Sequence, residues 1–173
     1  MELKIYQQEA LNTLTSFCKN YKESSGKVEE AFNNTLKNSE QFSEPYEPYL
    51  KVKESTAPYI CIRIPTGGGK TLIAAKSLKP VIEELYENDK TFLVIWLAPK
   101  DIIVNQTIKA LKNPKHPYRK AIDEDFPSTS INVMKLQHAL TNTFKKKTDI
   151  TILVGRMQSF NVGNDDIRKF YYL

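Results

Sequence analysis

The sequence predicts an α/β fold in which a parallel β-sheet is covered by helices. Short apolar runs alternate with segments of helical periodicity along most of the 173 residues, as in βα repeats. The apolar runs are continuous, which is typical of strands buried on both faces of a parallel sheet. The first run also leads directly into three glycines and a predicted helix. A chain of this length is large enough for one domain with a hydrophobic core.

The N-terminal third is predicted to contain one long helix followed by a polar segment. Apolar residues recur at helical spacing over residues 4–21, which predicts a helix. Residues 22–57 are polar and interrupted by prolines, so we expect a surface insertion with a short amphipathic helix around Phe32. The predicted organisation is therefore an N-terminal helix (1–21), an insertion (22–57) and an α/β region (58–173).

The first predicted strand and helix of the α/β region surround the glycines. Pro58 to Ile64 is a continuous apolar run and predicts a buried strand. A helix should begin at the glycines and extend towards Asn88. Pro80 interrupts it, because proline lacks an amide hydrogen and clashes with the preceding turn. We expect a kink or two short helices.

The remaining elements continue the alternation. Residues 91–98 predict a second buried strand with Trp96 in the core, and Asp101 is expected to cap the following helix. That helix should turn Ile103, Ile108 and Leu111 inward. Further on we expect a loop over 112–129, a short strand over 131–134, a helix over 135–143, a strand over 150–154 and the start of a helix over 165–173.

Composition excludes little but favours some classes. The net charge of +5 suits a nucleic-acid partner, although lysine-rich surfaces also serve solubility alone. Cys18 and Cys61 lack metal-ligand spacing, and Cys61 falls in an apolar run, so a buried free thiol in a reducing compartment is expected. No stretch approaches the roughly 18 apolar residues of a membrane span, so we predict a cytoplasmic protein without a membrane partner.

The glycines carry the strongest functional prediction. They belong to the loop Pro65–Thr66–Gly67–Gly68–Gly69–Lys70–Thr71, placed between a predicted strand and a predicted helix. Glycines let backbone amides approach an anion closely, and amides at a helix start carry partial positive charge. Lys70 can reach the β- and γ-phosphates of ATP, and the Thr71 hydroxyl can ligate Mg²⁺. The alternative is a glycine turn that only joins a strand to a helix. Ile64 also stands where the motif usually begins with a small residue.

Four segments resemble motifs of superfamily 2 helicases and translocases, in the family's order, and most resemble the restriction subunit of type III restriction–modification enzymes. Only the second is specific by itself. The segments are Leu3–Leu11, similar to the adenine-reading glutamine motif; Ile64–Thr71, similar to motif I; Leu97–Thr107, similar to motif Ia; and Ile152–Asn161, similar to a later nucleic-acid-contacting motif.

The resemblance implies a P-loop NTPase fold, a RecA-like lobe that is incomplete at the C-terminus, and a set of site residues. Thr66 to Thr71 would bind the phosphates of ATP with Mg²⁺, with Lys70 as the catalytic residue, and Gln7 beside Tyr6 would contact adenine. The alternative for these two residues is that Tyr6 packs inside and Gln7 faces solvent. The residues implied to contact the DNA backbone are Pro99, Lys100, Gln106, Thr107, Arg156, Gln158 and Ser159. Simple capping of a helix by Asp101 is the alternative for motif Ia.

Hydrolysis in this superfamily needs an Asp-Glu pair at the end of a later buried strand, and the sequence does not supply one. Asp123–Glu124–Asp125 follows a segment that is no buried strand, and neither is the segment before Asp165–Asp166, so both are expected to be solvated acidic turns. We therefore expect an N-terminal piece of a motor that binds ATP with negligible turnover. The resemblance implies duplex DNA, a second RecA-like lobe and a methyltransferase subunit as partners.

Two other functions remain open at this stage. An RNA helicase lobe of the DEAD-box kind would carry Pro-Thr-Arg-Glu-Leu at motif Ia, where this chain has Pro99–Lys100–Asp101–Ile102–Ile103. A non-catalytic, nucleotide-responsive binding module, or a degenerate gene product, would need no further motifs.

Overall fold

The computed structural model describes residues 2–37, 49, 57–86, 91–141 and 149–160. The chain forms two compact units, Met1–Glu87 and Asn88–Leu173. Each unit has a hydrophobic cluster of its own. The predicted C-terminal helix, the pair Asp165–Asp166 and most of the insertion lie outside the described residues.

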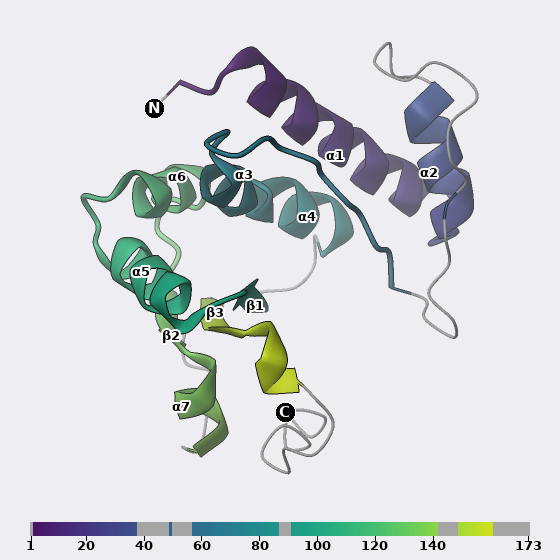
Figure 1. Cartoon of the computed structure of the whole chain (residues 1–173). Coiled ribbons are helices and arrows are strands. Elements are labelled where there is room, and N and C mark those ends of the chain that lie inside the picture. The colour runs from purple at the N-terminus through teal and green to yellow at the C-terminus, as the bar shows by residue number, and fades with distance from the viewer. Residues whose placement is uncertain (1, 38–48, 50–56, 87–90, 142–148, 161–173) are drawn as a thin grey trace. The chain divides into compact units, whose positions relative to one another are not determined.

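The described part of the first unit contains four helices: α1 (Ile5–Glu23), α2 (Val28–Lys37), α3 (Lys70–Lys76) and α4 (Leu78–Leu85). One face of α1 is buried and packs against α2 and α4 (Figure 1). Its core combines Leu14, Phe17 and Cys18 with Ala31 of α2, and Val81 and Leu85 of α4 pack against this cluster. Both helices predicted before residue 57 are therefore confirmed.

The predicted interruption near Pro80 is also confirmed, as two short helices separated by Ser77. The break lies three residues before the proline for a geometric reason. Pro80 cannot donate to the carbonyl four residues earlier, that of Lys76, and its ring crowds that carbonyl. Lys76 is the last residue of α3, and Ser77 donates both its amide and its hydroxyl to the Ile73 carbonyl, at 2.8 and 2.7 Å.

The strand predicted over Pro58–Ile64 is wrong, because this segment has no ladder hydrogen bonds and no strand is assigned there. Tyr59 and Ile60 are 53% and 44% exposed, and Cys61 is exposed rather than buried. Ile62 packs against the core of the first unit. An apolar run indicates a preference for burial, whereas a strand also needs a neighbouring strand to accept its backbone hydrogen bonds.

Among its described residues the second unit has a parallel three-stranded sheet in the order β1–β3–β2. The strands are β1 (Phe92–Ala98), β2 (Ile131–Lys135) and β3 (Ile150–Arg156), close to the predicted ranges. Ile152 of β3 aligns with Val94 on one side and Val133 on the other. β3 is buried along nearly its whole length because it is the central strand. The small parallel sheet confirms the α/β class and is consistent with a RecA-like lobe.

Burial of β1 on both faces is not observed. Leu93, Ile95 and Leu97 are 39%, 41% and 40% exposed, and Trp96 is half-buried. The exposed positions alternate with more buried ones, so one face of β1 is covered and the other is open. A continuous apolar run therefore describes the central strand correctly and the outer strand incorrectly.

The described part of the second unit also contains the helices α5 (Asp101–Lys112), α6 (Pro117–Asp125) and α7 (Leu136–Thr141) and the 3₁₀ turn η1 (Met157–Phe160). α5 buries Val104, Thr107, Ala110 and Leu111, whereas Ile103, predicted to face inward, is 39% exposed. α6 occupies half of the predicted loop. It begins with Pro117, and the Nδ1 atom of His116 accepts a hydrogen bond from the Tyr118 amide at 3.3 Å.

Candidate functional site

The glycine loop of the first unit has a shape that only glycine allows. Gly67 and Gly69 have φ values of 78° and 79°, in the left-handed region. A Cβ atom on Gly68 would lie 2.6 Å from Cγ2 of Ile64 and 2.9 Å from the Pro65 carbonyl oxygen. Backbone conformation at two positions and space at the third therefore explain the three consecutive glycines.

The loop presents amides that an anion can accept from. The Ile73 amide donates to the Gly69 carbonyl at 3.0 Å, which is the first helical bond of α3. In the part of the chain that the structure describes, the amides of Gly69, Lys70 and Thr71 have no acceptor. Unsatisfied amides at the start of a helix are the usual donors to bound phosphate.

The charged side chain of the loop is accessible. Lys70 is exposed, and its Nζ atom donates to the Pro65 carbonyl at 3.1 Å. Thr66 is exposed, and Thr71 is half-buried on the first turn of α3. A glycine-lined backbone, free amides, one exposed ammonium and the threonine hydroxyls form a set of groups that fits a triphosphate with a divalent cation.

The start of α1 contacts this loop directly. Gln7 is 5% exposed; its Nε2 atom donates to the Gly68 carbonyl at 2.8 Å, and its Oε1 atom accepts from the Lys4 amide at 3.0 Å. The Tyr6 hydroxyl donates to the same Gly68 carbonyl at 3.0 Å. Gln7 therefore does not face solvent. The contact of Tyr6 was not foreseen, because nothing in the sequence indicates which backbone atom a tyrosine hydroxyl will reach.

A second cluster lies at the carboxyl ends of β1 and β3, where Ala98 aligns with Arg156. An Oδ2 atom of Asp101 lies 3.1 Å from Nη1 of Arg156. The predicted cap by Asp101 is wrong, since Lys100 occupies the N-cap position and no side chain caps α5. The Nε atom of Arg156 is buried and has no acceptor among the described residues.

The sequence matches one protein family, described as "Type III restriction enzyme, res subunit", over residues 1–171. The chain belongs to this family. It therefore carries a helicase-like domain of the kind found in superfamily 2, of the restriction-enzyme type. No curated protein and no solved structure matches the chain.

In this res-family chain, the residues expected to contact nucleic acid differ in their solvent exposure. Pro99, Lys100, Gln106 and Gln158 are exposed. Thr107 is 6% exposed and faces the interior, so its hydroxyl is not part of the surface. η1 includes Ser159, whose side chain lies outside the described residues.

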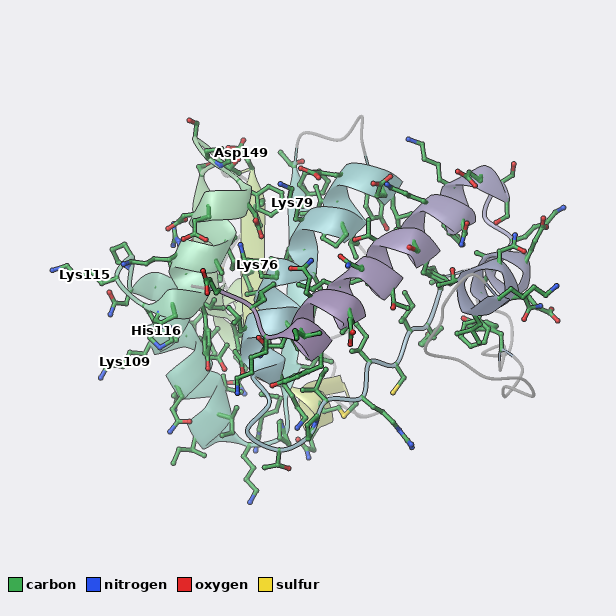
Figure 2. All side chains as sticks on the ribbon, turned by 90° about the horizontal axis from the view of Figure 1, so that it is seen from above. Lys76, Lys79, Lys109, Lys115, His116 and Asp149 are labelled. Carbon is green, nitrogen blue, oxygen red and sulfur yellow. The ribbon has the colours of Figure 1, made fainter. Side chains whose placement is uncertain are left out.

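A basic surface that motif comparison did not indicate surrounds the connection from α5 to α6. Its exposed members are Lys109, Lys112, Lys115 and Lys120. Lys109 and Lys115 point away from the ribbon (Figure 2). Arg119 is not available to a partner in the same way, because its Nε atom is 2.7 Å from Asp123. In the sequence, this basic surface is indicated only by the recurrence of lysines at and after the end of the predicted helix.

Two of the described side chains in the res-family domain have shifted pKa values. Burial, with a smaller contribution from the Glu84 carboxylate, raises the pKa of the Cys18 thiol to about 11. Hydrogen bonds from the amide and the hydroxyl of Ser130, at 2.8 and 3.0 Å, lower the pKa of Asp149. The two bonds to Asp149 connect the segments that precede β2 and β3, which gives Asp149 a structural role.

The described residues contain neither a metal-binding cluster nor a membrane-spanning helix. No group of three or more His, Cys, Asp or Glu residues in those segments is arranged to hold a metal ion. Within them, no helix has the length and apolar character needed to cross a bilayer.

Proposed function

We propose that this chain binds Mg²⁺–ATP through residues 65–71 and is the ATP-binding part of a DNA-translocating motor of the type III restriction kind. The observation that carries the proposal is the glycine loop, with free amides and an accessible Lys70, in a chain of the res family. Such a loop holds several N–H dipoles already oriented towards one anion, so that they can replace its water ligands.

Each side chain has a distinct role in this proposal. Lys70 leaves the Pro65 carbonyl and pairs with the β- and γ-phosphates, a charge-assisted contact. Thr71 ligates Mg²⁺, which neutralises phosphate charge. Gln7 retains one amide hydrogen and one lone pair beyond its present bonds, which suffices for the polar edge of adenine. The sequence lacks an Asp-Glu pair in a strand context, so we propose ATP binding with negligible turnover for this chain.

The DNA-contacting surface is proposed at the carboxyl ends of β1 and β3. Lys100 and Arg156 supply positive charge there, and Pro99, Gln106 and Gln158 supply exposed groups beside it. Contacts of this kind hold the phosphate backbone and carry no sequence information. Thr107 is excluded from the proposed surface because it is buried. Duplex DNA, a second RecA-like lobe and a methyltransferase subunit are the proposed partners.

The test of nucleotide binding is Lys70→Ala, with Lys79→Ala as the matched control. Lys79 is also a partly exposed lysine of the first unit, on α4, but it pairs with Glu83. Loss of a charge-assisted contact of about 1.5–3 kcal/mol predicts roughly 10- to 150-fold weaker binding of a non-hydrolysable ATP analogue with Mg²⁺. Isothermal titration calorimetry measures it. Unchanged affinity in Lys70→Ala, or equal weakening in Lys79→Ala, would refute the assignment.

A further inference from the structure

Two side chains at the start of α1 bind one carbonyl of the glycine loop. The Tyr6 hydroxyl and the Gln7 amide donate to the Gly68 oxygen at 3.0 and 2.8 Å. Gly68 is buried, and its own amide donates to the Pro65 carbonyl at 3.0 Å. Hydrogen bonds therefore hold both the amide and the carbonyl of Gly68, the middle glycine of the loop.

Fixing this carbonyl also orients the next amide. A trans peptide is planar, so the Gly68 C=O and the Gly69 N–H point in opposite directions. When Tyr6 and Gln7 hold the carbonyl on their side, the Gly69 N–H is turned away from α1. That amide has no acceptor within the described residues, and it is one of the donors assigned above to phosphate.

The contact between α1 and the loop is close enough to define one orientation of the loop's peptide plane. A Cβ atom on Gly69 would lie 2.6 Å from Nε2 of Gln7, so the loop backbone and the Gln7 side chain are in direct contact. Gln7 is also fixed from its other end by the Lys4 amide. With glycine at three consecutive positions, the peptide plane has few intrinsic restraints, and these side chains supply them.

We propose that Tyr6, acting with Gln7, is a positioning residue for the triphosphate: its hydroxyl holds the Gly68–Gly69 peptide so that the Gly69 amide faces the anion. This inference rests on the proposed phosphate site. It differs from a base-contacting role in one measurable respect. A residue that acts only on adenine has no effect on a ligand without a base, whereas a residue that orients the loop does.

The experiment therefore compares Mg²⁺–ATP with Mg²⁺–tripolyphosphate, which has no base or sugar, by calorimetry. The variant is Tyr6→Phe, which removes only the hydroxyl. Tyr118→Phe is the matched control, since it removes a tyrosine hydroxyl from the second unit. Replacing Tyr6 with 4-aminophenylalanine keeps a donor at the ring position and serves as the rescue.

Tyr6→Phe is expected to weaken tripolyphosphate and ATP by the same factor, about 3- to 10-fold for one hydrogen bond. The control should remain within twofold of wild type, and the amino variant should recover most of the affinity. Wild-type tripolyphosphate affinity in Tyr6→Phe, or a loss confined to ATP, would overturn the inference and leave the phosphate site intact. Failure of the wild-type chain to bind either ligand would instead overturn the proposed function, and this inference with it.

Discussion

The glycine loop allows two alanine substitutions to be compared. Both introduce the same backbone strain, and only one of them brings a methyl group against Gln7. Gly67→Ala and Gly69→Ala both place a methyl group on a residue with φ near 78°, which costs about 1–2 kcal/mol. Alanine also stabilises by restricting the unfolded chain, which offsets about 0.4–1 kcal/mol at both positions. At Gly67 the added methyl would meet nothing within 4 Å. Its net cost is therefore small, about 1 kcal/mol.

Gly69→Ala carries an additional cost because its Cβ would lie 2.6 Å from Nε2 of Gln7. Gln7 must then release the Gly68 carbonyl, which removes a hydrogen bond and leaves a buried amide short of a partner. Together these effects cost about 1–3 kcal/mol beyond the strain. Gly69→Ala should therefore destabilise the first unit by about 2–4 kcal/mol.

Urea unfolding followed by far-UV circular dichroism measures both variants. Hydrogen exchange over residues 5–23 then assigns the loss to α1, where faster exchange in Gly69→Ala should exceed that in Gly67→Ala. Equal destabilisation by the two substitutions would show that the contact with Gln7 contributes nothing. That result would refute the reasoning, whatever the absolute values.

Three further predictions concern other parts of the molecule. Iodoacetamide at pH 8 should modify the exposed Cys61 in the folded chain and leave Cys18 unmodified until urea unfolds it; equal rates in a mass-spectrometric time course would contradict the burial and the raised pKa of Cys18. Because the pKa of Asp149 is lowered in the folded state, its stabilising contribution is present above about pH 4 and is lost as the pH falls. Asp149→Asn should therefore lower the urea midpoint more at pH 7 than near pH 2.5, and an equal difference at both pH values would count against this assignment. Asp101→Ala should free Arg156 and tighten duplex DNA binding by about 1.5- to 5-fold in fluorescence anisotropy at low salt, the scale of one exposed ion pair; weaker binding would assign Asp101 a supporting role instead.

The sequence predicted those features that depend on local chemistry. Pro80 interrupts its helix because the missing amide and the ring act within one turn. The glycine loop was predicted for the same reason, since φ and space are properties of a few adjacent residues. The family match over residues 1–171 agrees with the resemblance found from the motifs.

Features that depend on distant neighbours were not predicted correctly. Residues 58–64 have strand composition, but no neighbouring strand supplies their hydrogen bonds. Asp101 has the composition of a helix cap, yet it pairs with Arg156, which is remote in sequence. Periodicity places Tyr6 among the apolar positions of its helix. Only the structure shows that it is half-buried and which carbonyl its hydroxyl reaches.

The position of β1 at the edge of the sheet and its exposed apolar side chains affect how the protein will behave at high concentration. Among the described strands β1 pairs only with β3, so it is an edge strand, and its side chains Leu93, Ile95 and Leu97 are exposed. Exposed apolar edge strands act as templates for another copy of the chain. Storage at millimolar concentration should therefore favour self-association and turbidity, and a lysine at position 95 should reduce both.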